Sequence, residues 1–139
     1  MKKVIEEYID VEKELECGYF ATKSKELFTG IGEISYNECF YDYEAKYFSN
    51  SVRLSARAEI EECEAEKIRH VSRLLVKFLG IRGISRIDFL KSRTGEIFFN
   101  EINTMPGFTE SSLYPKLVAE CGIPPHELVK LLIEDTKGE

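Results

Sequence analysis

Two apolar segments joined by a short polar turn constrain the fold of this chain most. Residues 84–91 and 96–102 are rich in Ile and Phe. The run Ser92-Arg93-Thr94-Gly95 between them has the polar, glycine-containing composition of a turn. Apolar β-formers on both sides of such a turn predict an antiparallel β-hairpin.

The simplest register of this hairpin pairs Lys91 with Glu96 and sets Arg86 opposite Glu101. Side chains alternate between the two faces of a strand, so residues two apart share a face. Unless a single-residue bulge breaks this register, four polar side chains are then expected on one face of the hairpin: Arg86, Asp88, Glu101 and Asn103.

Carboxylate and amide oxygens are the ligands that hard divalent cations such as Mg²⁺ prefer. A guanidinium beside such a cation suits chemistry on a phosphate group. The alternative is a solvated polar face with an ordinary Arg–Glu cross-strand pair. The hairpin alone leaves both interpretations open.

The composition is that of a single globular domain over residues 1–139. The net charge is −6, from 25 acidic and 19 basic residues. This charge argues against nucleic acid as a partner, because a duplex binder needs a basic footprint. The N-terminus has no apolar signal-peptide core, and no apolar run approaches membrane-spanning length. We therefore expect a cytoplasmic protein without a membrane partner.

Four cysteines and two histidines are scattered along the chain: Cys17, Cys39, Cys63, Cys121, His70 and His126. No C-x-x-C pair occurs among them, which argues against a zinc site or a disulfide framework. We expect reduced and mostly buried thiols. Neither histidine lies in the sequence pattern of a hydrolytic triad.

Strands are predicted at residues 4–9, 15–22 and 31–40, with a turn signal at 28–32 between the last two. A strand that starts so close to the first residue suggests a piece of a longer protein, although a natural short protein is also compatible with such a start. Residues 41–47 have no clear periodicity and are expected to form an ordered loop.

Apolar residues at helical spacing predict a helix within residues 60–79, with Gly80 as its C-terminal stop. A short helix is expected over 114–120, and Pro124-Pro125 opens a last helix. Strands grouped early and helices on one side of an antiparallel sheet predict an α+β domain.

Three segments in this order resemble D-alanine–D-alanine ligases of the ATP-grasp superfamily: residues 40–47 (FYDYEAKY), 85–88 (SRID) and 100–109 (NEINTMPGFT). The similarity extends from about residue 6 to the end. The chain is therefore similar to the C-terminal ATP-grasp subdomain, without the N-terminal domain and most of the central one. Residues 1–10 would then be the hinge strand that joins the missing central subdomain.

The resemblance implies a two-step reaction. ATP phosphorylates the carboxylate of one D-alanine, and the amine of a second D-alanine attacks the acylphosphate to give a cell-wall precursor. It also implies Mg²⁺ (two ions, or Mn²⁺) as the cofactor. ATP, D-alanine and the missing domains are the implied partners, and the full-length enzyme is compatible with a homodimer.

The matched positions have the following implied roles. Asp88, Glu101 and Asn103 are the metal ligands, and Arg86 and the backbone N–H of Gly107 stabilise the transferring phosphate and the oxyanion. The alternative for Asn103 is a turn-capping side chain. Ser112 and Leu113 hold the carboxylate of the second D-alanine at a helix start, although a serine there also suits a helix cap.

The nucleotide is expected to contact backbone and side-chain groups of several segments: Glu6, Glu7, Tyr8, Ile9, Glu14, Lys46, Asn100 and Glu101. Lys46 and Tyr47 match a loop that closes over the site, where Tyr47 orients groups from the missing domains.

Two other functions stay open. One is a related ligase that joins D-alanine to D-serine or D-lactate, and the other is a non-catalytic module with the same fold. In the ligase reading the isolated chain is expected to lack turnover, because the phosphate-binding lysines of the central domain are missing.

Overall fold

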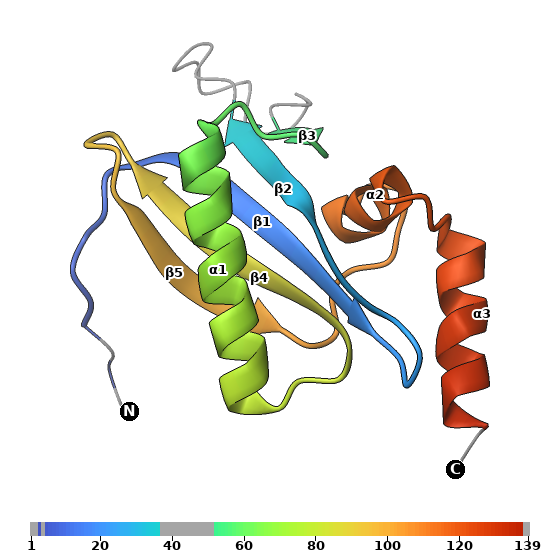
Figure 1. Ribbon diagram of the computed structural model, residues 1–139. Helices are drawn as coiled ribbons and strands as arrows, with labels where there is room; N and C mark the ends of the chain where they lie inside the picture. The colour runs from blue at the N-terminus through green and yellow to red at the C-terminus, as the bar shows by residue number, and fades with distance from the viewer. Residues whose placement is uncertain (1–2, 4, 37–51, 138–139) are drawn as a thin grey trace.

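The computed structural model describes residues 3, 5–36 and 52–137. In this part the elements are, in chain order, β1 (Val11–Ala21), β2 (Glu26–Tyr36), β3 (Val52–Ser55), α1 (Glu62–Leu79), β4 (Gly83–Ser92), β5 (Ile97–Asn103), α2 (Leu113–Glu120) and α3 (Pro125–Thr136). The strands form one antiparallel sheet in the order β3-β2-β1-β4-β5 (Figure 1). The predicted α+β class with an antiparallel sheet is confirmed.

Successive residues of the central strand β1 face two different groups of helices. Leu15 and Cys17 belong to a core cluster with Ile68 of α1. Phe20 belongs to a separate cluster with Tyr114 of α2. Because neighbouring side chains of a strand point to opposite faces, α1 covers one face of the sheet and α2 packs on the other.

The grouping of elements in the sequence suggested that all helices lie on one side of the sheet. That part of the prediction is wrong. In Figure 1, α1 crosses the near face of the sheet, and α2 and α3 lie beyond β2. The apolar residues of both faces of β1 explain the difference, because each face needs its own cover.

The long helix forms as the sequence predicts. Ile68 and Val76 are buried on its core side. Glu61 and Glu64 form a reciprocal capping box at its start, which satisfies backbone N–H groups that have no intrahelical partner. Gly80 ends the helix in the left-handed conformation (φ 63°), so the predicted stop is confirmed.

The two C-terminal helices are also confirmed. Gly122 follows the end of α2 with φ 82°. Pro124 is the N-cap of α3 and Pro125 lies in its first turn, where a missing N–H costs no helical hydrogen bond. Leu128 of α3 is fully buried.

The predicted strand at residues 4–9 is wrong. Residues 5–9 form no strand, and Ile5 and Tyr8 are exposed. The first strand begins only at Val11, where it can pair with β4. Ile and Tyr favour a strand, but the backbone groups of a strand also need a neighbour, and this segment runs apart from the sheet (Figure 1).

The predicted turn at 28–32 is wrong as well, since these residues lie inside β2. The chain reverses instead at Thr22–Lys25, where the Thr22 N–H donates to the Lys25 carbonyl at 2.7 Å. Strand β3 was not predicted, and residues 41–47, which include Lys46 and Tyr47, lie outside the described residues.

The cysteines are less buried than expected. Cys17 is buried, and this burial raises the pKa of its thiol to about 11. Cys63 and Cys121 are exposed, which corrects the expectation of mostly buried thiols, and Cys39 lies outside the described residues. Among the helices that the structure describes, none has the length and apolar character to cross a membrane.

Gly32, one of the two glycines that suggested a turn, serves packing instead. A Cβ at Gly32 would lie 2.9 Å from a methyl carbon of Leu113 and 3.0 Å from one of Leu117. Such distances are shorter than van der Waals contact, so only glycine lets α2 approach β2 this closely.

We predict that Gly32→Ala lowers the free energy of unfolding by about 1–3 kcal/mol, because the added methyl group overpacks the contact between β2 and α2. Thermal and urea unfolding measure this change. Gly30→Ala, on the same strand, is the matched control, since a Cβ at Gly30 would meet nothing within 4 Å. Equal destabilisation by both substitutions would contradict the packing role of Gly32.

Candidate functional site

The hairpin of β4 and β5 contains a bulge that the sequence did not reveal. Phe89 pairs with Phe99, and the neighbouring Asp88 pairs with Glu101. Asn100 is left without a partner on β4. A single extra residue of this kind is a β-bulge, and it moves all later residues by one position in the register.

The bulge decides which face carries Glu101. If the pairing of the residues next to the turn continued without the bulge, Glu101 would lie opposite Ile87. Ile87 is fully buried in the core next to α1. With it, Glu101 lies opposite Asp88 and Asn103 lies opposite Arg86. Paired residues share a face, so the four polar side chains do come together.

The simple register is therefore wrong, because Lys91 pairs with Ile97 and Arg86 with Asn103. The deduction of a shared face nevertheless holds. Beyond the bulge the observed register differs from the expected one by two residues, and a shift of two preserves the face.

A fifth polar residue joins this face from β1. Glu16 pairs with Asp88 across the β1–β4 ladder. Three carboxylates thus occupy neighbouring positions on three adjacent strands, in the order Glu16, Asp88, Glu101. We call these residues, with Arg86 and Asn103, the polar row.

Arg86 is the cation of the polar row. Its Nε donates to Oδ1 of Asp88 and its Nη2 to Oδ2, each at 2.7 Å. Its Nε also lies 3.4 Å from Oε1 of Glu16. The hydrogen bonds to Asp88 and the charges of the neighbouring acids raise the pKa of Arg86, so it stays a fixed positive charge.

Glu16 is the member of the polar row that sequence reasoning missed. It is only 4% exposed, and its Oε2 is buried without a hydrogen-bond partner among the residues that the structure describes. Burial raises the pKa of Glu16 to about 7, partly opposed by Arg86 and reinforced by Asp88 and Glu14. The sequence feature that could have revealed Glu16 is an acidic residue within a strand, directly between the core residues Leu15 and Cys17.

The start of α2 lies next to the polar row. Arg86 pairs with Gly18 of β1, and a Cβ at Gly18 would lie 3.3 Å from the ring of Tyr114 in α2. The Tyr114 hydroxyl donates to the Tyr19 carbonyl at 2.8 Å, which ties this helix turn to β1. The packing thus brings the segment before α2 to the same face as Arg86.

Gly107 and Ser112, both expected in the site, lie side by side. A Cβ at Gly107 would lie 2.7 Å from Oγ of Ser112, so glycine is required for this approach. Ser112 is the N-cap residue of α2, but its hydroxyl makes no capping bond and accepts instead from the Thr109 N–H at 3.2 Å. The first N–H groups of α2 therefore have no side-chain cap.

The structure also describes the other predicted ligands. Asn103 accepts a hydrogen bond from the Met105 N–H at 2.9 Å through Oδ1, which is the turn-capping contact considered for it. The side chain of Leu113 is buried against the sheet, so only its backbone faces the helix start.

This geometry can be compared with known proteins. The family model described as "D-ala D-ala ligase C-terminus" matches residues 1–134. The chain belongs to this D-alanine–D-alanine ligase C-terminal family.

Among relatives of this family, the chain is 40% identical over 134 residues to the D-alanine–D-alanine ligase of Acetivibrio thermocellus. That alignment covers 96% of the chain and 35% of the relative. It is 43% identical over 135 residues to the enzyme of Ruminiclostridium cellulolyticum, with 94% and 35% covered. The chain thus spans about a third of the length of these relatives.

Solved structures agree with the family. D-alanyl-alanine synthetase A from Vibrio cholerae matches with a TM-score of 0.79 and 31% identity over 92% of this chain and 39% of that one. VanG D-Ala:D-Ser ligase from Enterococcus faecalis has a TM-score of 0.71 and 31% identity, covering 92% and 37%. The Bacillus anthracis ligase complexed with ATP has a TM-score of 0.69 and 29% identity, covering 92% and 40%.

The positions that the ligase resemblance assigns to the nucleotide are less organised. Glu6, Glu7 and Tyr8 are exposed and Ile9 is half-buried, in a segment without regular structure. Glu14 lies on β1 two residues before Glu16, so it shares the face of the polar row. Asn100 is the exposed bulge residue.

No three His, Cys, Asp or Glu side chains in the described ranges form a metal-binding group as they stand. The two predicted carboxylate ligands are on one face, but both oxygens of Asp88 are taken up by Arg86. Convergence on a cation would therefore require a different orientation of Asp88.

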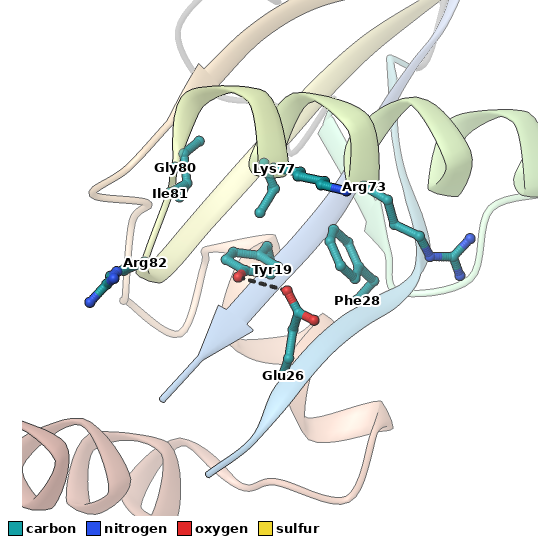
Figure 2. Close-up of a pocket in the computed structure, with 9 residues that line it drawn as sticks. Tyr19, Glu26, Phe28, Arg73, Lys77, Gly80, Ile81 and Arg82 are labelled. Atoms are coloured by element: carbon teal, nitrogen blue, oxygen red, sulfur yellow. Dashed lines mark hydrogen bonds between the residues drawn. The ribbon is translucent and has the colours of Figure 1, made fainter. Parts of the chain in front are cut away.

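A separate cavity of about 540 Å³ lies on the α1 face of the sheet, away from the polar row. Figure 2 shows Tyr19 donating to Glu26 in it, while the charged ends of Arg73 and Arg82 extend outward on opposite sides. Arg73 stacks over Phe28 at 5.8 Å from the ring centroid. The basic groups do not converge, and the cavity plays no part in the site.

We predict that Glu16 makes the metal-free protein less stable as pH rises. Its folded pKa of about 7 exceeds the reference value of 4.5, so the folded state binds the proton more tightly. This contribution is present below pH 4.5 and is lost by about pH 7, a decrease of up to roughly 3 kcal/mol in the free energy of unfolding.

Urea unfolding between pH 5 and pH 8 in the presence of EDTA measures this slope. Glu16→Gln should remove it, whereas Glu14→Gln, which removes an acid from the same face of the same strand, should retain it. An identical slope in wild type and Glu16→Gln would contradict the assignment.

Proposed function

We propose that this chain is the metal-, nucleotide- and acceptor-binding C-terminal part of an enzyme that joins two D-alanine molecules at the expense of ATP. The observation that carries the proposal is the polar row: one permanent cation and three carboxylates on the sheet face next to the start of α2. Membership of the ligase C-terminal family supports the same reaction.

Arg86 would stabilise the charge that develops during the reaction. A phosphoryl group that moves from ATP to a D-alanine carboxylate carries negative charge throughout, and so does the tetrahedral centre formed when the second amine attacks. Arg86 is held in place by Asp88 and Glu16, so little reorganisation is needed. Gly107, whose backbone is accessible for lack of a side chain, would donate its N–H to the same oxyanion.

The donor set fits Mg²⁺. Asp88, Glu101 and Asn103 offer carboxylate and amide oxygens, and the polar row has three carboxylates for one guanidinium. Two divalent cations held there would neutralise the phosphate oxygens of ATP. Glu101 is exposed on the edge strand β5 and pairs with Asp88, so it would hold the cations together with Asp88.

The start of α2 would hold the carboxylate of the second D-alanine. The uncapped N–H groups of its first turn and the positive end of the helix favour an anion. Ser112 would contribute its hydroxyl and Leu113 its backbone N–H, since the Leu113 side chain is buried. Glu6 to Ile9 would contact the adenine and Glu14 the ribose, and Lys46 and Tyr47 would close over the site.

A second candidate is ligation of D-alanine to D-serine. It is favoured by the similarity to the VanG D-Ala:D-Ser ligase, which is as close in identity as the Vibrio cholerae enzyme. The acceptor pocket distinguishes the two, so the same assay with D-alanine, D-serine and D-lactate as acceptors separates them. We expect D-alanine to be preferred.

A chimera tests the function directly. Residues 1–134, which the family model matches, replace the corresponding segment of the Acetivibrio thermocellus ligase, whose alignment with this chain is 40% identical over 134 residues. We expect phosphate release that depends on D-alanine and Mg²⁺. Arg86→Lys in the chimera should lower kcat about 10²–10³-fold, because a lysine cannot offer the paired donors of a guanidinium.

Arg73→Lys is the matched control, since Arg73 lies on the α1 face next to Phe28. A chimera that folds, binds ATP and releases no phosphate would contradict the proposed function. So would an Arg86→Lys variant as active as its Arg73→Lys counterpart.

The chain without further domains should show no D-alanine-dependent phosphate release, because it lacks the groups that we assign to the missing central domain. A coupled assay of phosphate release with Mg²⁺-ATP and D-alanine measures this. Turnover above the rate of the Arg86→Lys variant would show that the chain contains a complete site.

A further inference from the structure

Arg86 and a metal ion held by Asp88 would compete for the same carboxylate oxygens. Both carboxylate oxygens of Asp88 accept hydrogen bonds from Arg86 at 2.7 Å. A cation bound to Asp88 would withdraw at least one of these oxygens and would also repel the guanidinium. An arginine that must still face the phosphate then needs another acceptor.

Glu16 is placed to be that acceptor. Its Oε1 lies 3.4 Å from Nε of Arg86, and its side chain is only 5% exposed. Within the described part of the chain, its Oε2 is a buried oxygen without a hydrogen-bond partner. An unpaired buried carboxylate oxygen is costly, so an additional bond from Arg86 would be favourable.

The fold keeps Glu16 in position while its neighbours rearrange. It lies on β1, the central strand, with backbone pairing to β2 on one side and β4 on the other. Asp88 pairs with Glu101 on the other side of β4, toward the edge of the sheet. The acid on the edge side can therefore meet a cation while the acid on the core side holds the arginine.

We propose that Glu16 is a positioning residue that holds Arg86 on the site face when Asp88 turns to a divalent cation. Arg86 exchanges a bidentate pair with Asp88 for a pair with Glu16, and its charge stays directed at the phosphate. This inference rests on the proposed function, because it takes the cation to bind Asp88 and Glu101.

NMR of the Arg86 Nε–H group in the intact chain provides the test, because it reports on the arginine itself and not on turnover. The signal is assigned by its loss in Arg86→Lys. Its exchange rate with water is measured with and without Mg²⁺ in wild type, Glu16→Gln and Glu14→Gln. The carboxyl carbon signals of Asp88 and Glu101 are followed in the same titration.

We expect Mg²⁺ to shift the Asp88 carboxyl signal while the Arg86 Nε–H stays protected in wild type and in Glu14→Gln. In Glu16→Gln, Mg²⁺ should speed exchange of this proton roughly tenfold or more, the effect of losing a charge-assisted hydrogen bond. Unchanged protection in Glu16→Gln with a shifted Asp88 would overturn the role of Glu16 and leave the proposed metal site standing.

A metal-free comparison separates the two hypotheses. Asp88→Asn weakens the hydrogen bonds between this position and Arg86 without any cation. Glu16 alone should then protect the Arg86 Nε–H from exchange with water. The double variant Asp88→Asn with Glu16→Gln should lose this protection. If Mg²⁺ leaves Asp88 and Glu101 unchanged, the proposed metal site is wrong. Equal protection of the Arg86 Nε–H in Asp88→Asn and in the double variant would refute the link between Glu16 and Arg86, whatever the outcome of the Mg²⁺ titration.

Discussion

The antiparallel pairing of β1 with β4 is the constraint on which the rest of the structure depends. It joins the first strand to a strand far along the chain and makes β1 the centre of the sheet. The same ladder sets Glu16 beside Asp88 and Gly18 beside Arg86. The same backbone hydrogen bonds therefore position both core and site. Alternate residues of β1 pack against α1, and those between them include Glu16 of the polar row and Phe20, which packs with Tyr114 of α2.

The polar row is kept at an electrostatic cost. Taking Glu16 out of water disfavours its ionised form, and the neighbouring Asp88 adds to this effect. Arg86 offsets part of the cost with two short hydrogen bonds to Asp88 and an ion pair to Glu16. Removal of one partner from such a buried network leaves the others uncompensated. A face with three acids and one base is suited to a cation, which is the reason that we connect it with Mg²⁺.

The helices and the hairpin were predictable because local signals specify them. The apolar spacing of α1, its Gly80 stop and the prolines before α3 act within a few residues. Strand limits were not predictable to the same degree. Residues 5–9 look like a strand but pair with no strand in the described part of the chain. Gly30 and Gly32 look like a turn but lie within β2. In both places a partner distant in sequence decides the outcome.

By itself, the sequence determined the α+β class, the hairpin and the ligase resemblance with its candidate residues, because periodicity, turn chemistry and motif spacing are properties of neighbouring residues. The tertiary structure decided that the bulge at Asn100 turns Glu101 toward Asp88, that the helices divide between two faces, and that Glu16 joins Arg86. The physical reason is that register, burial and the desolvation of a carboxylate depend on contacts between strands far apart in the chain.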